Sequence, residues 1–278
     1  MIRIISEEEA PTVLGRSVDR VGEAMGISAP IVADVRLRGD EALKEYRQRF
    51  DLVALDEPLY LDAGGELKAN LQQAVEQASR NIQSFAEAQL VTSWMSEFSD
   101  GRSLGQLVRP LNSVGVYVPA GRYPLISTLL MAVIPAQVAG VPNIVVACPH
   151  PSREILAVAK MLGVKQILHA GGAQAIAAMA YGTESVKPVQ RIVGPGNAYV
   201  AAAKKLVSQD VAIDFVAGPS EILIVASQGN AEWIAADMLA QAEHDVDARA
   251  ILLTTDKEFA LRVQAEIEIQ LSSLSTVQ

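Results

Sequence analysis

The sequence predicts an α/β protein in which parallel sheets are connected by helical crossovers, with an N-terminal helical segment in front of them. Hydrophobic residues make up 50% of the 278 residues and aromatic residues only 5%, which is typical of buried parallel strands. After Arg109 short apolar runs alternate with amphipathic stretches, the pattern of strand–helix–strand units. The length allows one or two domains, each with a sizeable core.

The first 110 residues are predicted to be mainly helical, after a short strand at residues 1–5. Asp40 is a suitable N-cap for one of the helices. In another, apolar residues recur every three or four positions from Leu71 to Phe85. This portion is poor in catalytic side chains, so it reads as scaffold or oligomer surface. The predicted helices span 7–25, 29–37, 41–50 and 67–90.

The alternating portion is predicted to contain six strands and six helices. The strands are short apolar runs bounded by glycine, proline or polar residues, and amphipathic helices separate them. The predicted strands span 114–118, 143–148, 166–169, 191–193, 222–226 and 250–253. The predicted helices span 127–139, 152–162, 173–181, 197–207, 231–243 and 256–271. The last helix has an apolar face that we expect a further part of a protein to cover.

Charge and composition exclude several classes of protein. The net charge of −9 argues against general nucleic-acid binding. Residues 113–200 carry six basic and two acidic side chains, which leaves −13 for the remainder; this section suits an anion such as a nucleotide, although scattered solvated lysines explain it equally well. The start of the chain is unlike a signal peptide, and the apolar window 125–141 is interrupted by polar residues and proline. The lone Cys148 fits a reducing compartment, so we expect a cytoplasmic location.

Three glycine turns follow predicted strands, at 119–122, 170–174 and 194–197. Ligands of open α/β sheets bind at the carboxyl ends of strands, where helix N-termini attract phosphate. Gln174 would begin one helix, and Asn197 would precede another, where simple capping explains it as well. None of these turns is the dinucleotide fingerprint, and Asp214 lies only roughly where a ribose-binding acid would be.

Gln241 and His244 are a candidate pair of metal ligands. They lie three residues apart near the end of a predicted helix, so they project from one side of it. A zinc site needs about four donors, and the sequence offers no obvious third. A helix that ends in polar surface residues is the simpler reading. Of the other histidines, His150 lies in a Pro-His-Pro loop, and His169 ends an apolar strand where it faces either the core or a site.

Several strings resemble the histidinol dehydrogenase family, in the order found there. They are Val114-Gly-Val-Tyr-Val-Pro-Ala-Gly121, Gly171-Gly-Ala-Gln-Ala-Ile-Ala177, Gly194-Pro-Gly-Asn197, Ala217-Gly-Pro-Ser-Glu221 and Gln241-Ala-Glu-His244. The segments Ala33-Asp-Val-Arg to Gly39-Asp-Glu-Ala-Leu43 and Arg49-Phe-Asp51 are similar to the first helices of that family. The similarity covers essentially the whole chain, and we identify it as a member of the family.

The resemblance implies a homodimeric, zinc-dependent enzyme that oxidises L-histidinol to L-histidine in two NAD-linked steps through a bound aldehyde. It assigns NAD contacts to Tyr117, Gln174 and Asn197. Ser220 would contact the substrate, and Gln241 and His244 would bind zinc and lie against the substrate. It also implies two incomplete Rossmann-like lobes. One is the NAD-contacting section 111–220, and the other combines 1–110 with 221–278.

The sequence departs from the family at the catalytic centre. The family's general base and acid form a Glu-His pair in a Gly-Pro-Glu-His-Leu string, and an Asp and a late His complete its zinc site, the His supplied by the partner subunit. None of these occurs in the 278 residues. We therefore expect little or no dehydrogenase activity from this chain alone. Two alternatives stay open: a dehydrogenase of the same family for another small alcohol, and a non-catalytic remnant that binds NAD or a partner chain.

Overall fold

The structure, a computed structural model, describes residues 2–11, 20–120, 124–216, 221–244 and 248–274, without the side chain of His244. The chain divides into two compact units. The larger unit is Asp19–Val216, and the smaller one combines Met1–Val18 with Ala217–Gln278. Each unit has its own hydrophobic cluster, so each is described by itself.

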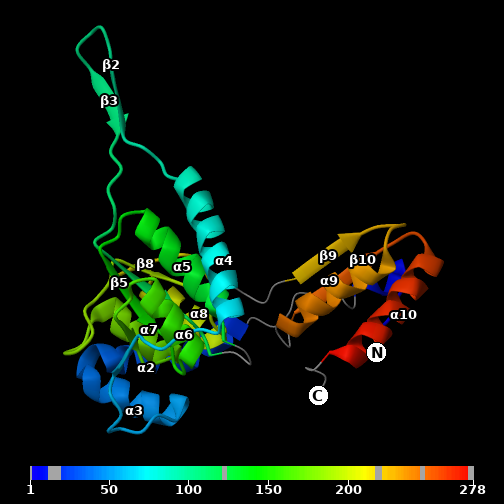
Figure 1. The fold of residues 1–278 in the computed structure, drawn as a ribbon, viewed down its shortest axis with the longest axis horizontal. Coiled ribbons are helices and arrows are strands. Elements are labelled where there is room, and N and C mark those ends of the chain that lie inside the picture. Colours follow the sequence, from blue (N-terminus) through cyan, green and yellow to red (C-terminus); the bar gives the residue numbers. More distant parts are fainter. Residues whose placement is uncertain (1, 12–19, 121–123, 217–220, 245–247, 275–278) are drawn as a thin grey trace. The chain divides into compact units, whose positions relative to one another are not determined.

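The larger unit is built on a six-stranded sheet with the order β1-β6-β5-β4-β7-β8 (Figure 1). Strands β4 to β8 pair in parallel, while β1 joins the edge of β6 antiparallel. The strands are β1 (Tyr60–Asp62), β4 (Ser113–Tyr117), β5 (Asn143–Ala147), β6 (Gln166–Leu168), β7 (Arg191–Val193) and β8 (Ala212–Ile213). This is the parallel sheet with helical crossovers that the sequence predicts.

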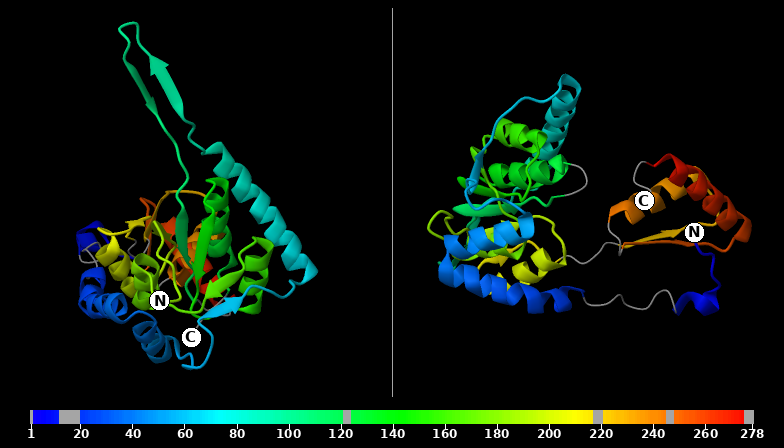
Figure 2. Two further views of the ribbon diagram at one scale, coloured as in Figure 1. Left: turned by 90° about the vertical axis from the view of Figure 1, so that its left-hand side faces the viewer. Right: turned by 90° about the horizontal axis from the view of Figure 1, so that it is seen from below.

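Helices cover both faces of this sheet (Figure 2). Val114, Val116 and Val118 on β4 and just after it pack with the cluster that includes α4, α5 and α6. Tyr117 points to the opposite cluster, with α2, α3, α7 and α8. The alternation arises because successive strand residues face opposite sides, and both sides are apolar when a sheet is buried. The helices are α2 (Arg20–Arg38), α3 (Asp40–Asp51), α4 (Ala69–Ala88), α5 (Ile126–Val138), α6 (Arg153–Met161), α7 (Gly172–Tyr181) and α8 (Ala198–Val207).

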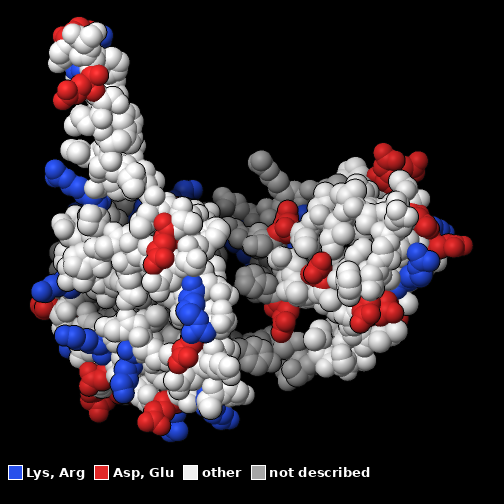
Figure 3. Space-filling view, turned by 45° about the horizontal axis from the view of Figure 1, so that its top comes forward, with Lys and Arg blue, Asp and Glu red and all other residues white. Residues whose placement is uncertain are grey.

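A two-stranded hairpin, β2 (Trp94–Glu97) with β3 (Ser103–Gln106), projects from the larger unit (Figure 1). All of its strand residues are exposed, including Trp94 at 50%. Its charged side chains are concentrated near its tip (Figure 3). A lone hairpin is marginally stable in water, and exposed apolar side chains of this kind are typical of a surface that another chain covers.

The smaller unit contains the pair of parallel strands β9 (Glu221–Val225) and β10 (Arg249–Leu253), with α9 (Ala231–His244) and α10 (Lys257–Ser273). The two helices pack on one face of the strands, with Phe259 and Val263 in the core between them. The N-terminus belongs to this unit: Ile2 packs on the same core, and the Gln264 side-chain amide donates to its carbonyl oxygen at 2.9 Å. A short 3-10 helix, η1, spans Glu7–Glu9.

Most predicted elements after Arg109 match the structure to within a few residues. The differences lie mainly before it. β1 and the hairpin strands were not predicted, the short β8 was not predicted, and residues 2–5 form no strand. The two predicted helices before residue 38 are instead η1 and α2, which runs through Pro30; residues 12–19 lie outside the described part. The exposed hairpin has no one-sided apolar pattern by which periodicity would reveal it.

The two units also differ from the lobes expected from the resemblance. Residues 19–110 were grouped with the end of the chain, but they fall in the larger unit. The reason is packing, since Ile31, Val35 and Leu43 on α2 and α3 join the core formed by α7 and α8. In the described part of the chain no helix is long and apolar enough to cross a membrane.

Arg47 is a buried cation that holds the loop after α3 in place. Its side chain is fully buried, and its guanidinium donates to the carbonyl oxygens of Pro58 at 2.8 Å, Glu57 at 2.7 Å and Ala54 at 3.3 Å. Burial lowers its pKa from the usual value of an arginine. The guanidinium therefore replaces water for three carbonyl groups.

We expect Arg47→Met to lower the free energy of unfolding by about 3 kcal/mol, because three carbonyl oxygens of the loop would lose the charged donor that holds them together. Urea denaturation of the chain measures this. Arg49→Met, two residues along the same helix at an exposed position, is the matched control and should cost less than about 1 kcal/mol. Equal losses for the two variants would contradict the role given to Arg47.

Candidate functional site

The direction in which strands are added to the sheet reverses between β4 and β7, so the carboxyl edge at this point is the candidate ligand site. The chain continues from β4 to β5 and β6 on one side, and from β7 to β8 on the other. Open α/β sheets bind ligands where this reversal occurs, because the loops after the two central strands diverge. Tyr117 is the last residue of β4, and the turn Gly194-Pro-Gly196 directly follows β7.

Polar groups from three elements meet at the glycine turn after β6. The Gly172 N–H donates to the Tyr117 hydroxyl oxygen at 3.0 Å. The neighbouring Gly171 N–H donates to Asp51 Oδ2 at 2.9 Å. Gln174 Nε2 donates to the same Asp51 oxygen at 3.2 Å. We call Asp51, Tyr117, Gln174 and the turn Gly171–Gly172 the polar layer.

The polar layer lies beneath the surface of the larger unit. Tyr117 is 3% exposed and Gln174 1%, whereas Gly172 is partly exposed. Burial raises the pKa of the Tyr117 hydroxyl, so this group is neutral at physiological pH. Its oxygen accepts from Gly172, which leaves its proton to donate to another acceptor. Burial also raises the pKa of the Asp51 carboxyl, and the hydrogen bonds from Gly171 and Gln174 oppose that effect.

The turn after β7 is held by a buried ion pair between Lys204 and Asp214. Lys204 Nζ also donates to the Gly194 carbonyl oxygen at 3.0 Å, and Asp214 Oδ2 accepts from the Gly194 N–H at 2.9 Å. The Asp214 carboxylate is therefore bonded to the turn after β7 and to Lys204. Gly194 has φ +114°, and a Cβ at this position would overlap the Tyr117 carbonyl oxygen. Only glycine lets the two loops approach this closely.

Asn197 caps helix α8. Its side-chain oxygen accepts from the N–H groups of Tyr199 and Val200, both at 3.1 Å. The capping reading of this residue is therefore confirmed. The Asn197 Nδ2 group remains chemically able to donate to a ligand, but the helix N-terminus itself is partly occupied by the cap.

The two histidines near β6 lie next to the polar layer. His169 is buried, and its Nδ1 has no hydrogen-bond partner among the described residues. Its ring meets that of His150 edge to face, at 6.2 Å between centroids. Burial, and then the nearby charge of Arg47, lower the pKa of His169, so the imidazole is neutral at pH 7.

Burial also raises the pKa of the Cys148 thiol to about 11, which makes this thiol a poor nucleophile.

The candidate zinc ligands belong to the smaller unit. Gln241 and His244 lie on the last turn of α9, as predicted, and Gln241 is partly buried. Ser220 and the side chain of His244 lie outside the described residues. Within those residues, no three His, Cys, Asp or Glu side chains gather as a metal site. The donors in hand are an amide oxygen and an imidazole, which zinc accepts, but they are fewer than a complete site requires.

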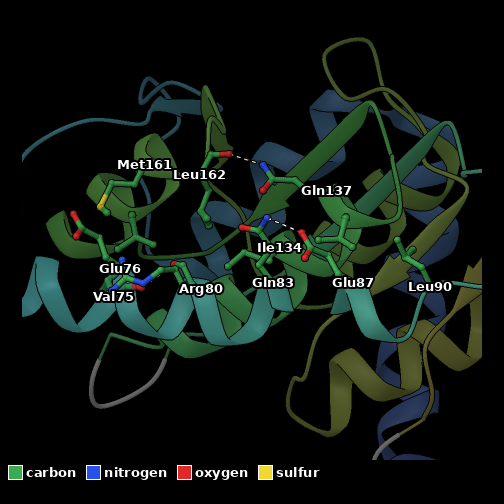
Figure 4. Close-up of a pocket in the computed structure, with 13 residues that line it drawn as sticks. Val75, Glu76, Arg80, Gln83, Glu87, Leu90, Ile134, Gln137, Met161 and Leu162 are labelled. Carbon is green, nitrogen blue, oxygen red and sulfur yellow. Dashed lines mark hydrogen bonds between the residues drawn. The ribbon is translucent and has the colours of Figure 1, made fainter. Parts of the chain in front are cut away.

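A surface groove of about 640 Å³ lies between α4 and the helices α5 and α6 (Figure 4). Gln137 and Leu162, at the ends of α5 and α6, are joined across it by a hydrogen bond of 2.5 Å. Crossover helices end near the start of the next strand, so this groove lies toward the amino edge of the sheet. It contains none of the predicted site residues, and we do not assign it as the functional site.

The structure thus brings two predicted site residues to the same turn and reveals two supporting residues. Tyr117 and Gln174 meet at the Gly172 turn, and Asn197 lies on the loop whose Gly194 abuts Tyr117. Asp51 and Lys204 were not predicted. Asp51 lies 120 residues from Gly171 in the chain, and no local pattern in the sequence connects them.

Comparisons with known proteins agree on one family. The family model described as histidinol dehydrogenase matches residues 15–278. The histidinol dehydrogenase of Geobacillus kaustophilus is 49% identical over 256 residues, covering 88% of this chain and 60% of that protein. That of Photobacterium profundum is 45% identical over 281 residues, covering 97% and 63%. The crystal structure of histidinol dehydrogenase from Elizabethkingia anophelis has a TM-score of 0.88 and 36% identity, covering 98% of this chain and 65% of that one. The chain therefore spans less than two thirds of the length of these relatives.

Substitution of Gly194 tests how closely the loops after β4 and β7 approach. We expect Gly194→Ala to lower the free energy of unfolding by about 3 kcal/mol, because the methyl group would overlap the Tyr117 carbonyl. Gly163→Ala is the matched control, since Gly163 has φ +74° but open space around it, and it should cost only about 1 kcal/mol. Thermal unfolding measures both; equal losses would show that backbone conformation alone explains the glycine.

Proposed function

The chain belongs to the histidinol dehydrogenase family, and from this premise we propose that the protein oxidises L-histidinol to L-histidine through the aldehyde, with NAD as the hydride acceptor. The observation that carries this proposal is the polar layer at the carboxyl edge of the sheet, which contains two of the three residues that the resemblance assigns to NAD, Tyr117 and Gln174. Histidine biosynthesis is the corresponding pathway, and a cytoplasmic location is part of the proposal.

The residues of the larger unit suit an anionic dinucleotide. Tyr117 has a hydroxyl proton to donate, and Asn197 has a side-chain N–H₂ group. Both come from loops at the carboxyl edge, where a pyrophosphate is bound in sheets of this type. Since Gln174 is almost fully buried, it would act on NAD mainly through the Gly172 turn beside it. NAD contacts by Tyr117, Gln174 and Asn197 are thus the proposed binding mode.

The residues of the smaller unit suit part of a zinc site. We propose Gln241 and His244 as ligands, with Ser220 against the substrate. When bound, zinc would polarise the alcohol oxygen of the substrate. A neutral glutamine oxygen leaves the metal most of its charge. Further ligands have to come from groups other than these two, and the resemblance assigns one of them to the partner subunit of a homodimer.

The homodimer is a proposal that the β2–β3 hairpin supports. Its apolar side chains are exposed, and Leu107 just after it is 67% exposed. Burial of such side chains against a second copy would stabilise a hairpin that is marginal alone.

A second candidate function is binding without turnover. In this alternative the polar layer of the larger unit binds NAD, as in the first candidate, but no hydride transfer follows. In that case the chain would bind NAD or a partner chain without oxidising an alcohol.

The two candidates differ in an assay of NAD reduction with L-histidinol and added zinc. We expect no measurable turnover by this chain, and turnover by a chain extended at its C-terminus with the Glu-His segment of a relative, because proton transfer needs that pair. A chelator should abolish the activity of the extended form. Turnover by the 278-residue chain would contradict the need for the pair, and a reaction only with other alcohols would exclude the substrate.

Tyr117→Phe should raise the dissociation constant for NAD about tenfold, since the ligand loses a hydroxyl donor and the Gly172 N–H loses its acceptor. Calorimetric titration with NAD measures the change without relying on turnover. Tyr181→Phe is the control, because the Tyr181 hydroxyl donates to Asp210 at the exposed end of α7; its NAD affinity should not change. An unaltered affinity of Tyr117→Phe would remove Tyr117 from the site.

A further inference from the structure

Asp51 occupies a position that opposes a carboxylate in two ways. It is the last residue of helix α3, where the partial negative charge of the helix end repels an anion. It is also only 7% exposed, and burial raises its pKa. Both effects cost stability, so hydrogen bonds must offset them. Two groups donate to it, the Gly171 N–H and Gln174 Nε2, and both belong to the glycine turn and the start of α7.

The hydrogen bond to Asp51 determines which way the Gln174 amide points. An ionised carboxylate only accepts hydrogen bonds, so Gln174 has to present Nε2 to it. The other end of the amide, Oε1, then lies beside Gly172, 2.7 Å from where a Cβ of that residue would be. If residue 51 could both donate and accept a hydrogen bond, either Nε2 or Oε1 of Gln174 could face it. The contact with Asp51 thus places the acceptor oxygen of the Gln174 amide beside Gly172.

Asp51 also fixes one half of the turn whose other half is fixed by Tyr117. Gly171 is bonded to α3 through Asp51, and Gly172 is bonded to β4 through Tyr117. Gly172 adopts φ +59°, a left-handed conformation that needs such support from its neighbours. Gly172 is partly exposed, whereas the other members of the polar layer are buried. The two hydrogen bonds therefore set the position of the one member of the layer that is partly exposed.

We propose that Asp51 is a positioning residue of the dinucleotide site: it orients the Gln174 amide and holds the Gly171–Gly172 turn in the shape that receives NAD. This inference rests on the proposed NAD-binding function. Asp51 itself does not touch the ligand; it acts through Gln174 and the turn. A purely structural role for Asp51 would instead change the stability of the fold and leave the effect on NAD independent of Gln174.

A double-mutant cycle separates these roles. Asp51→Asn keeps the size and an oxygen that accepts from Gly171, but its side-chain N–H₂ lets the Gln174 amide turn over. We expect this substitution to raise the dissociation constant for NAD about tenfold in the natural chain, and less than about twofold in a Gln174→Met background. Asp62→Asn is the matched control, because Asp62 accepts from the Gln166 amide at 2.9 Å on the edge strand β1, and it should leave NAD binding unchanged.

Calorimetry with NAD and urea unfolding of each variant give the readouts. An equal rise for Asp51→Asn in both backgrounds, or no rise in the natural chain, overturns the inference while the proposed function stands. Absence of NAD binding by the natural chain overturns the proposed function itself. If Asp51→Asn does not fold, Gln174→Met decides: a tenfold rise supports the inference, and an unchanged dissociation constant for the folded variant overturns it.

Discussion

The parallel pairing of β4 with β5 on one side and β7 on the other constrains the rest of the larger unit. Crossovers between parallel strands are right-handed, so strands added in opposite directions from β4 place their helices on opposite faces. Helices α5 and α6 accordingly join one apolar cluster, and α7 and α8 join the other. The polar layer lies at the carboxyl edge of this sheet, where Tyr117 ends β4 and the Gly171–Gly172 turn follows β6.

The sequence allowed the buried elements to be predicted and not the exposed ones. β4, β5 and their helices have apolar periodicity because both faces of each strand are covered. The hairpin β2–β3 has no buried face, and its position follows from contacts that periodicity does not record. The division of the chain into units was not predicted from the sequence for a similar reason. Helices α2 and α3 join the larger unit through apolar residues, and such residues would pack equally well in any core.

The place of a candidate site residue in the fold was predictable where that residue ends a strand or begins a helix. Tyr117, Gln174 and Asn197 lie at such positions, and the resemblance singled them out. Asp51 and Lys204 were missed because each bonds to a glycine backbone group and to a side chain outside its own helix, and no local pattern records such partners. Asp51 stands at a helix end, where an acid usually signifies a solvated surface, and Lys204 reads as one of many surface cations until its ion pair with Asp214 is seen.

The smaller unit has a consequence for the order in which the chain acquires structure. Ile2 packs with residues beyond Glu221, and its carbonyl is bonded to Gln264. During synthesis the segment around Ile2 therefore emerges long before the residues that it packs against. Residues 19–216 form the contacts of the larger unit among themselves. They can therefore fold as a unit before the smaller unit is complete. The segment around Ile2 thus reaches its final contacts late, with the loop-closure cost of a contact between residues 262 positions apart.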